Sequence, residues 1–182
     1  EVACENCAAA ARFNRVAAAN DAANVWVIVF SSSYFDRDTF GYDGDVFMLR
    51  SMDRGSSWSV PAPISDDAVT DGSRDLNPTV ARDHTGRWVV AWTSYRPLGG
   101  ADDLDGDIAV SVSVDAAVTW SAPVGARRDE EPDLATDRDA LLSTDDRGVW
   151  MLSWKTVPHA SSRWTELRHT YAAVADATCG DA

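Results

Sequence analysis

Three arginines lie in segments rich in turn-forming residues, and each is a candidate for binding an acidic ligand. They are Arg37, Arg74 and Arg96, with Asp36 beside the first and Tyr95 beside the last. A guanidinium group binds a carboxylate or a phosphate through parallel hydrogen bonds, and a tyrosine ring adds an apolar surface with a polar end. These five residues are therefore candidate ligand-binding residues. The alternative is that the arginines are solvated surface charges, which are common on soluble domains.

A short acidic segment carries alternating carboxylates at Asp103, Asp105 and Asp107. Such alternation is typical of calcium-binding loops, in which Ca²⁺ takes about six to eight oxygen ligands. The segment lacks the downstream glutamate of an EF-hand. Two interpretations stay open, a Ca²⁺ site and a structural turn, and no other cofactor is expected. No catalytic residue is assigned.

Three cysteines, Cys4, Cys7 and Cys179, stand near the two ends of the sequence. A zinc site would normally need four ligands, and the sequence holds no second Cys-x-x-Cys pair. We expect a disulfide between the terminal regions, with one cysteine left free or bridged to another chain. Because structural disulfides form in oxidising compartments, the cysteines and the acidic composition predict a secreted or periplasmic protein.

Charge and hydropathy argue against two classes of partner. The formal net charge of the 182-residue chain is −13, and a field of that sign repels a phosphate backbone, so nucleic acid is not expected. The longest apolar run covers 25–30, far fewer than the roughly 20 residues that a membrane-spanning helix needs. No membrane span is expected.

The sequence repeats every 62 positions. The clearest markers are Trp26, Trp88 and Trp150, which follow one another at this interval. The segments 43–61 and 105–123 match at the same offset in their Asp, Ser, Trp and Pro positions, while the third copy loses these markers towards its end. A fixed period of this length is typical of repeat architectures such as β-propellers.

Each repeat is expected to form β-strands. The segments 88–93 and 107–113 are apolar and β-branched, or alternate between apolar and small polar residues, as strands do. An Ala-rich stretch over 7–23 has helix propensity, but the repeat register predicts a strand over 15–19. The fold class is therefore all-β, with about three propeller blades of four antiparallel strands. The expected units are an N-terminal segment over 1–13 that completes a blade, blade 1 over 14–64, blade 2 over 65–126, and a degenerate, incomplete blade 3 over 127–182.

One turn motif, Ser-x-Asp-x-Gly-x-x-Trp, occurs twice in register, each time after Gly-Asp and with Ser-x-Pro following its Trp. The motif resembles the Asp-box, or BNR repeat, of the sialidase-like (neuraminidase) superfamily of β-propellers, over about 15–124. In that family the motif is structural and lies on the face opposite the active site. Its residues here are Ser51, Asp53, Gly55 and Trp58 in the first copy, and Ser113, Asp115, Ala117 and Trp120 in the second.

Physical chemistry gives each motif position a structural role. The Ser hydroxyl and the Asp carboxylate bond to turn backbone groups, Gly adopts a positive φ, and the Trp ring pins the turn to the blade. We therefore expect Ala117, which replaces the glycine, to strain its turn or to change its shape.

The resemblance implies a sialidase-like architecture, but the Arg-Ile-Pro motif of sialidases is absent. The aligned positions read Asn14-Arg15-Val16 and Leu76-Asn77-Pro78. We expect a non-catalytic module that binds a glycan or a protein, or an assembly subunit. The alternative is a sialidase-like glycoside hydrolase whose site is completed by a second chain. The ligand face would be formed by loops over 31–42, 94–104, 156–163, 65–76 and 125–131.

Three blades are half of a six-bladed ring, and propellers close with about four to eight blades. An open arc leaves two exposed flanks. We therefore expect a homodimer, or another protein that covers the flanks. The remaining alternative is that the chain is a segment of a larger propeller.

Overall fold

The computed structural model describes residues 13–33, 37–65, 68–70, 72–98, 105–126, 135–158 and 166–173, and of residues 13, 37 and 166–173 it describes the backbone. The predictions for Cys4, Cys7, Cys179, Asp36 and Asp103 concern residues outside these ranges.

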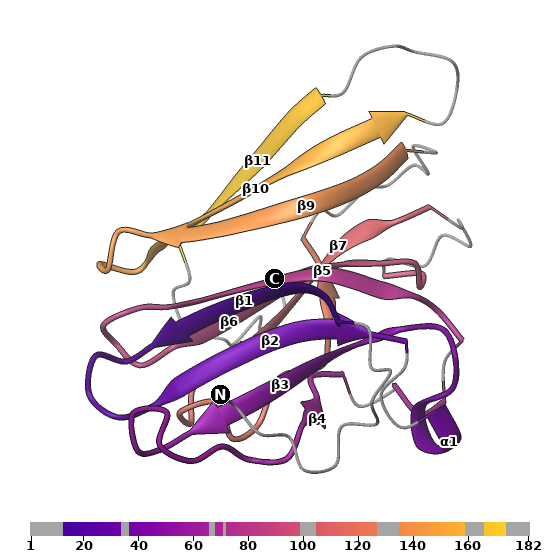
Figure 1. Ribbon diagram of the computed structural model, residues 1–182. Helices are drawn as coiled ribbons and strands as arrows, with labels where there is room; N and C mark the ends of the chain where they lie inside the picture. The colour runs from indigo at the N-terminus through magenta and orange to yellow at the C-terminus, as the bar shows by residue number, and fades with distance from the viewer. Residues whose placement is uncertain are drawn as a thin grey trace.

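The described chain forms three antiparallel sheets, which Figure 1 shows in succession from indigo to yellow. The first sheet has the order β1-β2-β3-β4, the second β5-β6-β7-β8 and the third β11-β10-β9. The expected all-β fold of propeller blades is confirmed, and the three sheets form an open arc. The strands are β1 (Phe13–Asn20), β2 (Trp26–Ser32), β3 (Asp45–Ser51), β4 (Ala62–Pro63), β5 (Asp75–Arg82), β6 (Trp88–Ser94), β7 (Asp107–Ser113), β8 (Val124–Gly125), β9 (Ala135–Thr144), β10 (Val149–Pro158) and β11 (Glu166–Ala173).

The repeat period governs the strand bounds. Each of β1 through β4 begins and ends one full repeat before its counterpart among β5 through β8. The Ala-rich segment at the start forms β1, because pairing with β2 outweighs its helix propensity. The connection between β2 and β3 contains a feature that the periodicity did not predict, the four-residue helix α1 (Arg37–Phe40). In the described part of the chain, no helix has the length and apolar character needed to cross a membrane.

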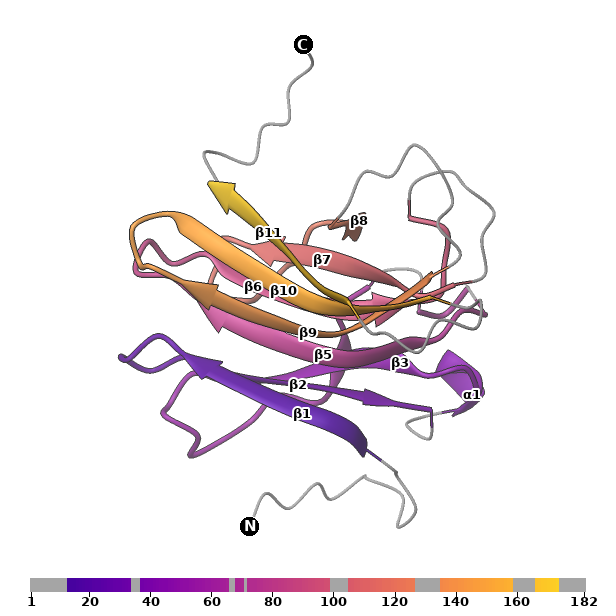
Figure 2. The ribbon, with the colours of Figure 1, turned by 90° about the horizontal axis from the view of Figure 1, so that it is seen from above.

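The core lies between the blades. Val27 and Val29 of β2 and Trp88, Val90 and Trp92 of β6 belong to one buried cluster, and each is at most 1 % exposed. A second cluster joins blades 2 and 3 through Ala91, Ile108, Ala140, Leu152 and Trp154. Alternate residues of a strand point to opposite faces, so blade 2, which lies between the other two, is apolar on both faces. Figure 2 shows the sheets following one another as this packing requires.

A backbone contact joins adjacent blades at one end of the strands. The Asp75 N–H donates to the Gly44 carbonyl oxygen at 2.7 Å, and the Asp137 N–H donates to the Gly106 carbonyl oxygen at 2.5 Å. The two contacts are one repeat apart, so each links the innermost strand of one blade to the start of the third strand of the blade before it.

The two Ser-x-Asp turns have nearly the same hydrogen bonds. Ser51 Oγ donates to Asp53 Oδ1 and accepts from the Gly55 N–H, both at 2.8 Å. Asp53 accepts from the N–H and the hydroxyl of Ser57 at 2.8 and 2.6 Å. In the second turn Ser113, Asp115, Ala117 and Thr119 repeat this set. The hydrogen bonds, first of all that of the Ser57 hydroxyl, lower the pKa of Asp53 to about 2.

The turn at Ala117 keeps the geometry of the first turn, and Ala117 therefore has a strained backbone conformation. The φ of Ala117 is +60°, and the φ of the equivalent Gly55 is +84°. Both values lie in the left-handed region, which is unfavourable for a residue with a Cβ. The methyl group of Ala117 is fully buried in the cluster between blades 1 and 2. Trp120 donates from Nε1 to Met48 Sδ of blade 1 at 3.3 Å, so its ring also contacts the neighbouring blade. Arg50 Nε donates to the Ala116 carbonyl oxygen at 2.7 Å, so the second turn also joins two blades.

A further repeated aspartate, not singled out in the sequence, closes the first hairpin of each blade. Asp21, Asp83 and Asp145 occupy the same repeat position, and each accepts backbone N–H donors of its turn through Oδ1. The pKa of all three carboxyls is lowered. For Asp83, burial raises the pKa, but bonds from Thr85 and Arg87 outweigh that effect.

Candidate functional site

The expected ligand face is the end of the strands where β2 leads into β3 and β6 leads into β7. It is the right-hand end in Figure 1, where α1 lies. Three of the predicted residues lie there together, because the Tyr95 N–H donates to the Arg74 carbonyl oxygen at 3.0 Å and Arg96 follows Tyr95. Arg74 is exposed, while Tyr95 and Arg96 are half-buried. Of the other candidates, Arg37 has a described backbone in α1, and Asp36 lies outside the described residues.

The Tyr95 ring lies against Gly106, at the start of β7. A Cβ placed on Gly106 would lie 3.2 Å from Tyr95 Cζ, 2.9 Å from Thr93 Cγ2 and 3.1 Å from Thr136 Cγ2. The position therefore excludes a side chain, and Thr136 brings blade 3 into the contact. Tyr95 is held at the junction of blades 2 and 3 by this close packing.

Four carboxylates at this end are buried. Asp45, Asp75, Asp105 and Asp137 are 3–5 % exposed. Asp137 Oδ1 accepts from the Thr156 hydroxyl at 2.5 Å, and the backbones of Asp75 and Asp137 join the blades. Among the described residues no group of three His, Cys, Asp or Glu side chains is placed to hold a metal. Since Asp103 lies outside those residues, the Ca²⁺ site with Asp105 and Asp107 stays a prediction.

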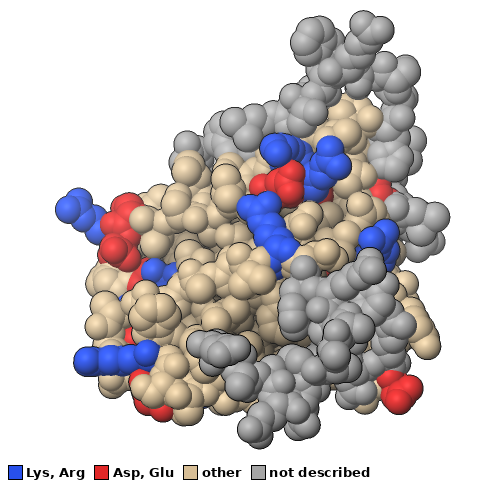
Figure 3. Space-filling view, viewed as in Figure 1, with Lys and Arg blue, Asp and Glu red and all other residues tan. Residues whose placement is uncertain are grey.

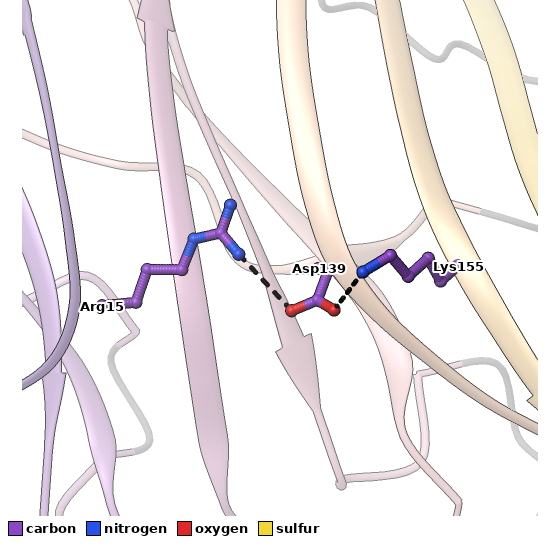
Figure 4. Close-up of polar contacts among 3 residues, drawn as sticks. All are labelled: Arg15, Asp139 and Lys155. Carbon is purple, nitrogen blue, oxygen red and sulfur yellow. Dashed lines mark hydrogen bonds and ion pairs between the residues drawn. The ribbon is translucent and has the colours of Figure 1, made fainter.

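A second cluster was not predicted from the sequence. Arg15 Nη1 lies 3.4 Å from Asp139 Oδ1, and Lys155 Nζ lies 3.0 Å from Asp139 Oδ2 (Figure 4). The three side chains are 35 %, 29 % and 54 % exposed in the order Arg15, Asp139, Lys155. Figure 3 shows basic side chains gathered around acidic ones within a largely uncharged surface.

Repeated bulges in the innermost strands position this cluster. Arg15, Asn77 and Asp139 occupy the same repeat position in β1, β5 and β9, with φ of +33°, +55° and +58°. The pairing register of each strand shifts there. Non-glycine residues at positive φ are uncommon, and bulges re-aim side chains. Arg15 of blade 1 stands two blades before Asp139 and Lys155 of blade 3 in the sequence, so repeat position alone does not reveal the ionic contact.

The cluster and the predicted arginines lie at the same end of the blades. Arg15 is near the start of β1, which pairs with the end of β2, and Lys155 is near the end of β10. Two cations around one carboxylate leave a net positive charge in a protein that is strongly acidic overall. A local excess of cationic groups favours the approach of anions in general.

Comparison with solved structures shows the fold that these blades share. The chain superposes on the Hadza microbial sialidase Hz136 with a TM-score of 0.66 at 15 % identity, over 88 % of this chain and 35 % of that one. For the GH93 α-L-arabinofuranosidase of Fusarium graminearum the TM-score is 0.61 at 14 % identity, over 88 % and 45 %. For the α-L-arabinanase of Penicillium chrysogenum it is 0.59 at 15 % identity, over 88 % and 46 %.

The chain thus spans less than half the length of these structures. No protein-family model matches the sequence, and no curated protein matches it. At such low identity the likeness establishes the architecture and leaves the activity open. The chain has the fold of the sialidase-like β-propellers, of which it forms three blades.

Proposed function

We propose that the chain is a non-catalytic propeller module that binds a carbohydrate. The binding site would be the end of the blades at which Arg74, Tyr95 and Arg96 lie. The observation that carries this proposal is the distribution of charge at that end. The four aspartates described above are buried, whereas Arg74 is exposed and Tyr95 and Arg96 are partly accessible. Asp38 of α1, at the same end, is exposed. A planar ring beside guanidinium groups suits a glycan that carries a carboxylate.

The burial of these acids argues against hydrolysis by them. Glycoside hydrolysis usually needs two carboxyl groups that flank the scissile bond. At 3–5 % exposure, Asp45, Asp75, Asp105 and Asp137 are not accessible to a substrate. Asp137 is further held by Thr156, and its backbone supports the junction with blade 2.

The second candidate is a sialidase-like glycoside hydrolase whose site is completed by another chain or segment. Its support comes from the superposed structures, which are named as a sialidase, an arabinofuranosidase and an arabinanase. In this case the missing carboxylates would come from outside the described residues. The Arg15, Asp139 and Lys155 cluster would then lie at the centre of the completed face.

A glycan array and two hydrolysis assays separate the candidates. The purified chain is tested on the array, then with fluorogenic sialosides and α-L-arabinofuranosides. Arg96→Ala is the test variant, and Arg147→Ala, an exposed arginine in the opposite β9–β10 turn, is the matched control. Glycan binding that is lost in Arg96→Ala and retained in Arg147→Ala supports the module. Turnover above background that Arg96→Ala abolishes shows a hydrolase, and an array without binding contradicts the proposal.

A further inference from the structure

The two outer flanks of the arc expose residues whose repeat equivalents are buried inside it. Trp88 and Trp150 are 1 % and 3 % exposed where they face the blade before them. Trp26, at the same repeat position in blade 1, is 38 % exposed. In blades 2 and 3 the preceding blade covers this tryptophan, whereas in blade 1 Trp26 is left exposed.

The opposite flank shows the same contrast. Val27 and Val89, which face the following blade, are 0 % and 5 % exposed, whereas their equivalent Met151 in blade 3 is 38 % exposed. Val25 is 5 % exposed and its equivalent Val149 is 42 % exposed. We call the first surface, around Trp26 and Ile28, the leading flank, and the second, around Val149, Met151 and Leu141, the trailing flank.

The two flanks are the two halves of a contact that the chain already makes internally. Between blades 1 and 2, Val27 and Val29 of a trailing face pack with Trp88 and Val90 of a leading face. The open faces have the same repeat positions, so one chain carries the counterparts of both partners. Trp26 and Ile28 stand for Trp88 and Val90, and Met151 and Ser153 stand for Val27 and Val29. The leading flank of another copy is therefore a surface of the kind that its trailing flank would contact.

One part of the leading flank is covered within the chain itself. Phe40 of α1 packs edge-on against Phe47 with ring centroids 5.1 Å apart, and Phe30 stacks on Phe47 at 5.8 Å. These rings lie towards the ligand end of blade 1. The open part of the flank is thus the half around Trp26 and Ile28, which lies farther from α1.

We propose that two copies of this chain associate head to tail, with the leading flank of each on the trailing flank of the other. Two identical contacts then close six blades, a number within the range of known propellers. The pairing also removes exposed apolar surface from both flanks. This inference is independent of the ligand proposed above.

Light scattering on the purified chain gives the first test. The expected mass is twice 19.7 kDa at micromolar concentration, and Met151→Glu or Trp26→Arg alone should halve it. Val114→Glu is the matched control, because Val114 is 71 % exposed but lies in the second Ser-x-Asp turn. Each variant is also checked for a cooperative thermal transition, so that loss of folding is not mistaken for loss of association.

Mixing the two flank variants gives a sharper test. A pair made of one Met151→Glu chain and one Trp26→Arg chain has one wild-type contact and one in which Glu faces Arg. The mixture should therefore recover the doubled mass that neither variant reaches alone. A folded wild-type monomer, a mass that grows beyond two copies with concentration, or a Met151→Glu chain that stays dimeric would overturn the proposal. A monomer is the result expected if another protein or a longer polypeptide covers the flanks instead.

Discussion

Arg15 and Asp139 occupy the same position of the repeat two blades apart, and their side chains meet with Nη1 and Oδ1 separated by 3.4 Å. The ion pair therefore spans the arc from blade 1 to blade 3, past blade 2, whose equivalent residue is Asn77. The contact shows that β1 of blade 1 and β9 of blade 3 come close enough at this position for two long side chains to pair.

A double-mutant cycle should give this ion pair a small coupling energy. Both side chains are about one-third exposed, and pairs of this kind contribute about 0.2–1 kcal/mol. We expect Arg15→Ala and Asp139→Ala to couple within that range in urea unfolding at low salt, and less at high salt. Lys155→Ala serves as the comparison, because Lys155 contacts the other carboxylate oxygen. A coupling above about 2 kcal/mol would show that the pair is far less solvated than described.

Gly106→Ala should destabilise the junction of blades 2 and 3. A Cβ would lie 2.9 Å from Thr93 Cγ2 and 3.1 Å from Thr136 Cγ2, and overpacking of this kind costs about 1–3 kcal/mol. Thermal unfolding measures the loss. Gly72→Ala is the matched control, since its added Cβ meets nothing within 4 Å. Equal melting temperatures for the two variants would contradict the crowded packing around Gly106.

Substitutions at the equivalent turn positions Gly55 and Ala117 should have unequal effects. Gly55→Ala places a Cβ at φ +84°, and the left-handed conformation costs an L-residue about 1–2 kcal/mol. Ala117→Gly relieves a similar strain at φ +60° but removes a buried methyl group worth about 0.8 kcal/mol. We therefore expect a clear loss for Gly55→Ala and nearly unchanged stability for Ala117→Gly. Chemical denaturation of both variants provides the measurement, and a large gain for Ala117→Gly would show that its methyl group packs poorly.

Stability should fall in acid as the turn carboxylates are protonated. Hydrogen bonds in the fold depress the pKa of Asp53 from 3.8 to about 2 and also lower the pKa of Asp115. A depressed pKa stabilises the fold above the unfolded value, and this contribution is lost as pH falls through the folded value. For Asp53 the window is therefore between about pH 4 and pH 2. Urea midpoints measured across this range should decline more steeply for the parent than for Asp53→Asn.

The strands and their register follow from the sequence because each marker recurs at a fixed offset. Trp26, Trp88 and Trp150 begin or nearly begin a second strand in every blade. The repeated hairpin aspartates could have been found by the same offset, since Asp21, Asp83 and Asp145 recur at the interval of the tryptophans. A single carboxylate within an ordinary turn is too common a signal to stand out without its hydrogen bonds.

The candidate site was less predictable, because it depends on how the blades are arranged in space. The sequence places Arg74, Tyr95 and Arg96 in loops of one end, and their role in binding stays a prediction. The contact of Asp139 with Arg15 and Lys155 depends on the curvature of the arc and on bulges in β1 and β9. Likewise, the contact of Trp120 with Met48 depends on the packing of two sheets, which the turn motif does not encode.

The outermost strands of blades 1 and 2 are poor sites for the addition of a strand from another chain. β4 and β8 have two residues each, and prolines stand at or beside them, at Pro61, Pro63 and Pro123. Proline has no N–H to donate, and so short an edge offers little template for strand addition. The eight-residue β11 forms the outer edge of the third described sheet. Growth of a sheet by addition of a foreign strand is therefore discouraged at the outer edges of blades 1 and 2.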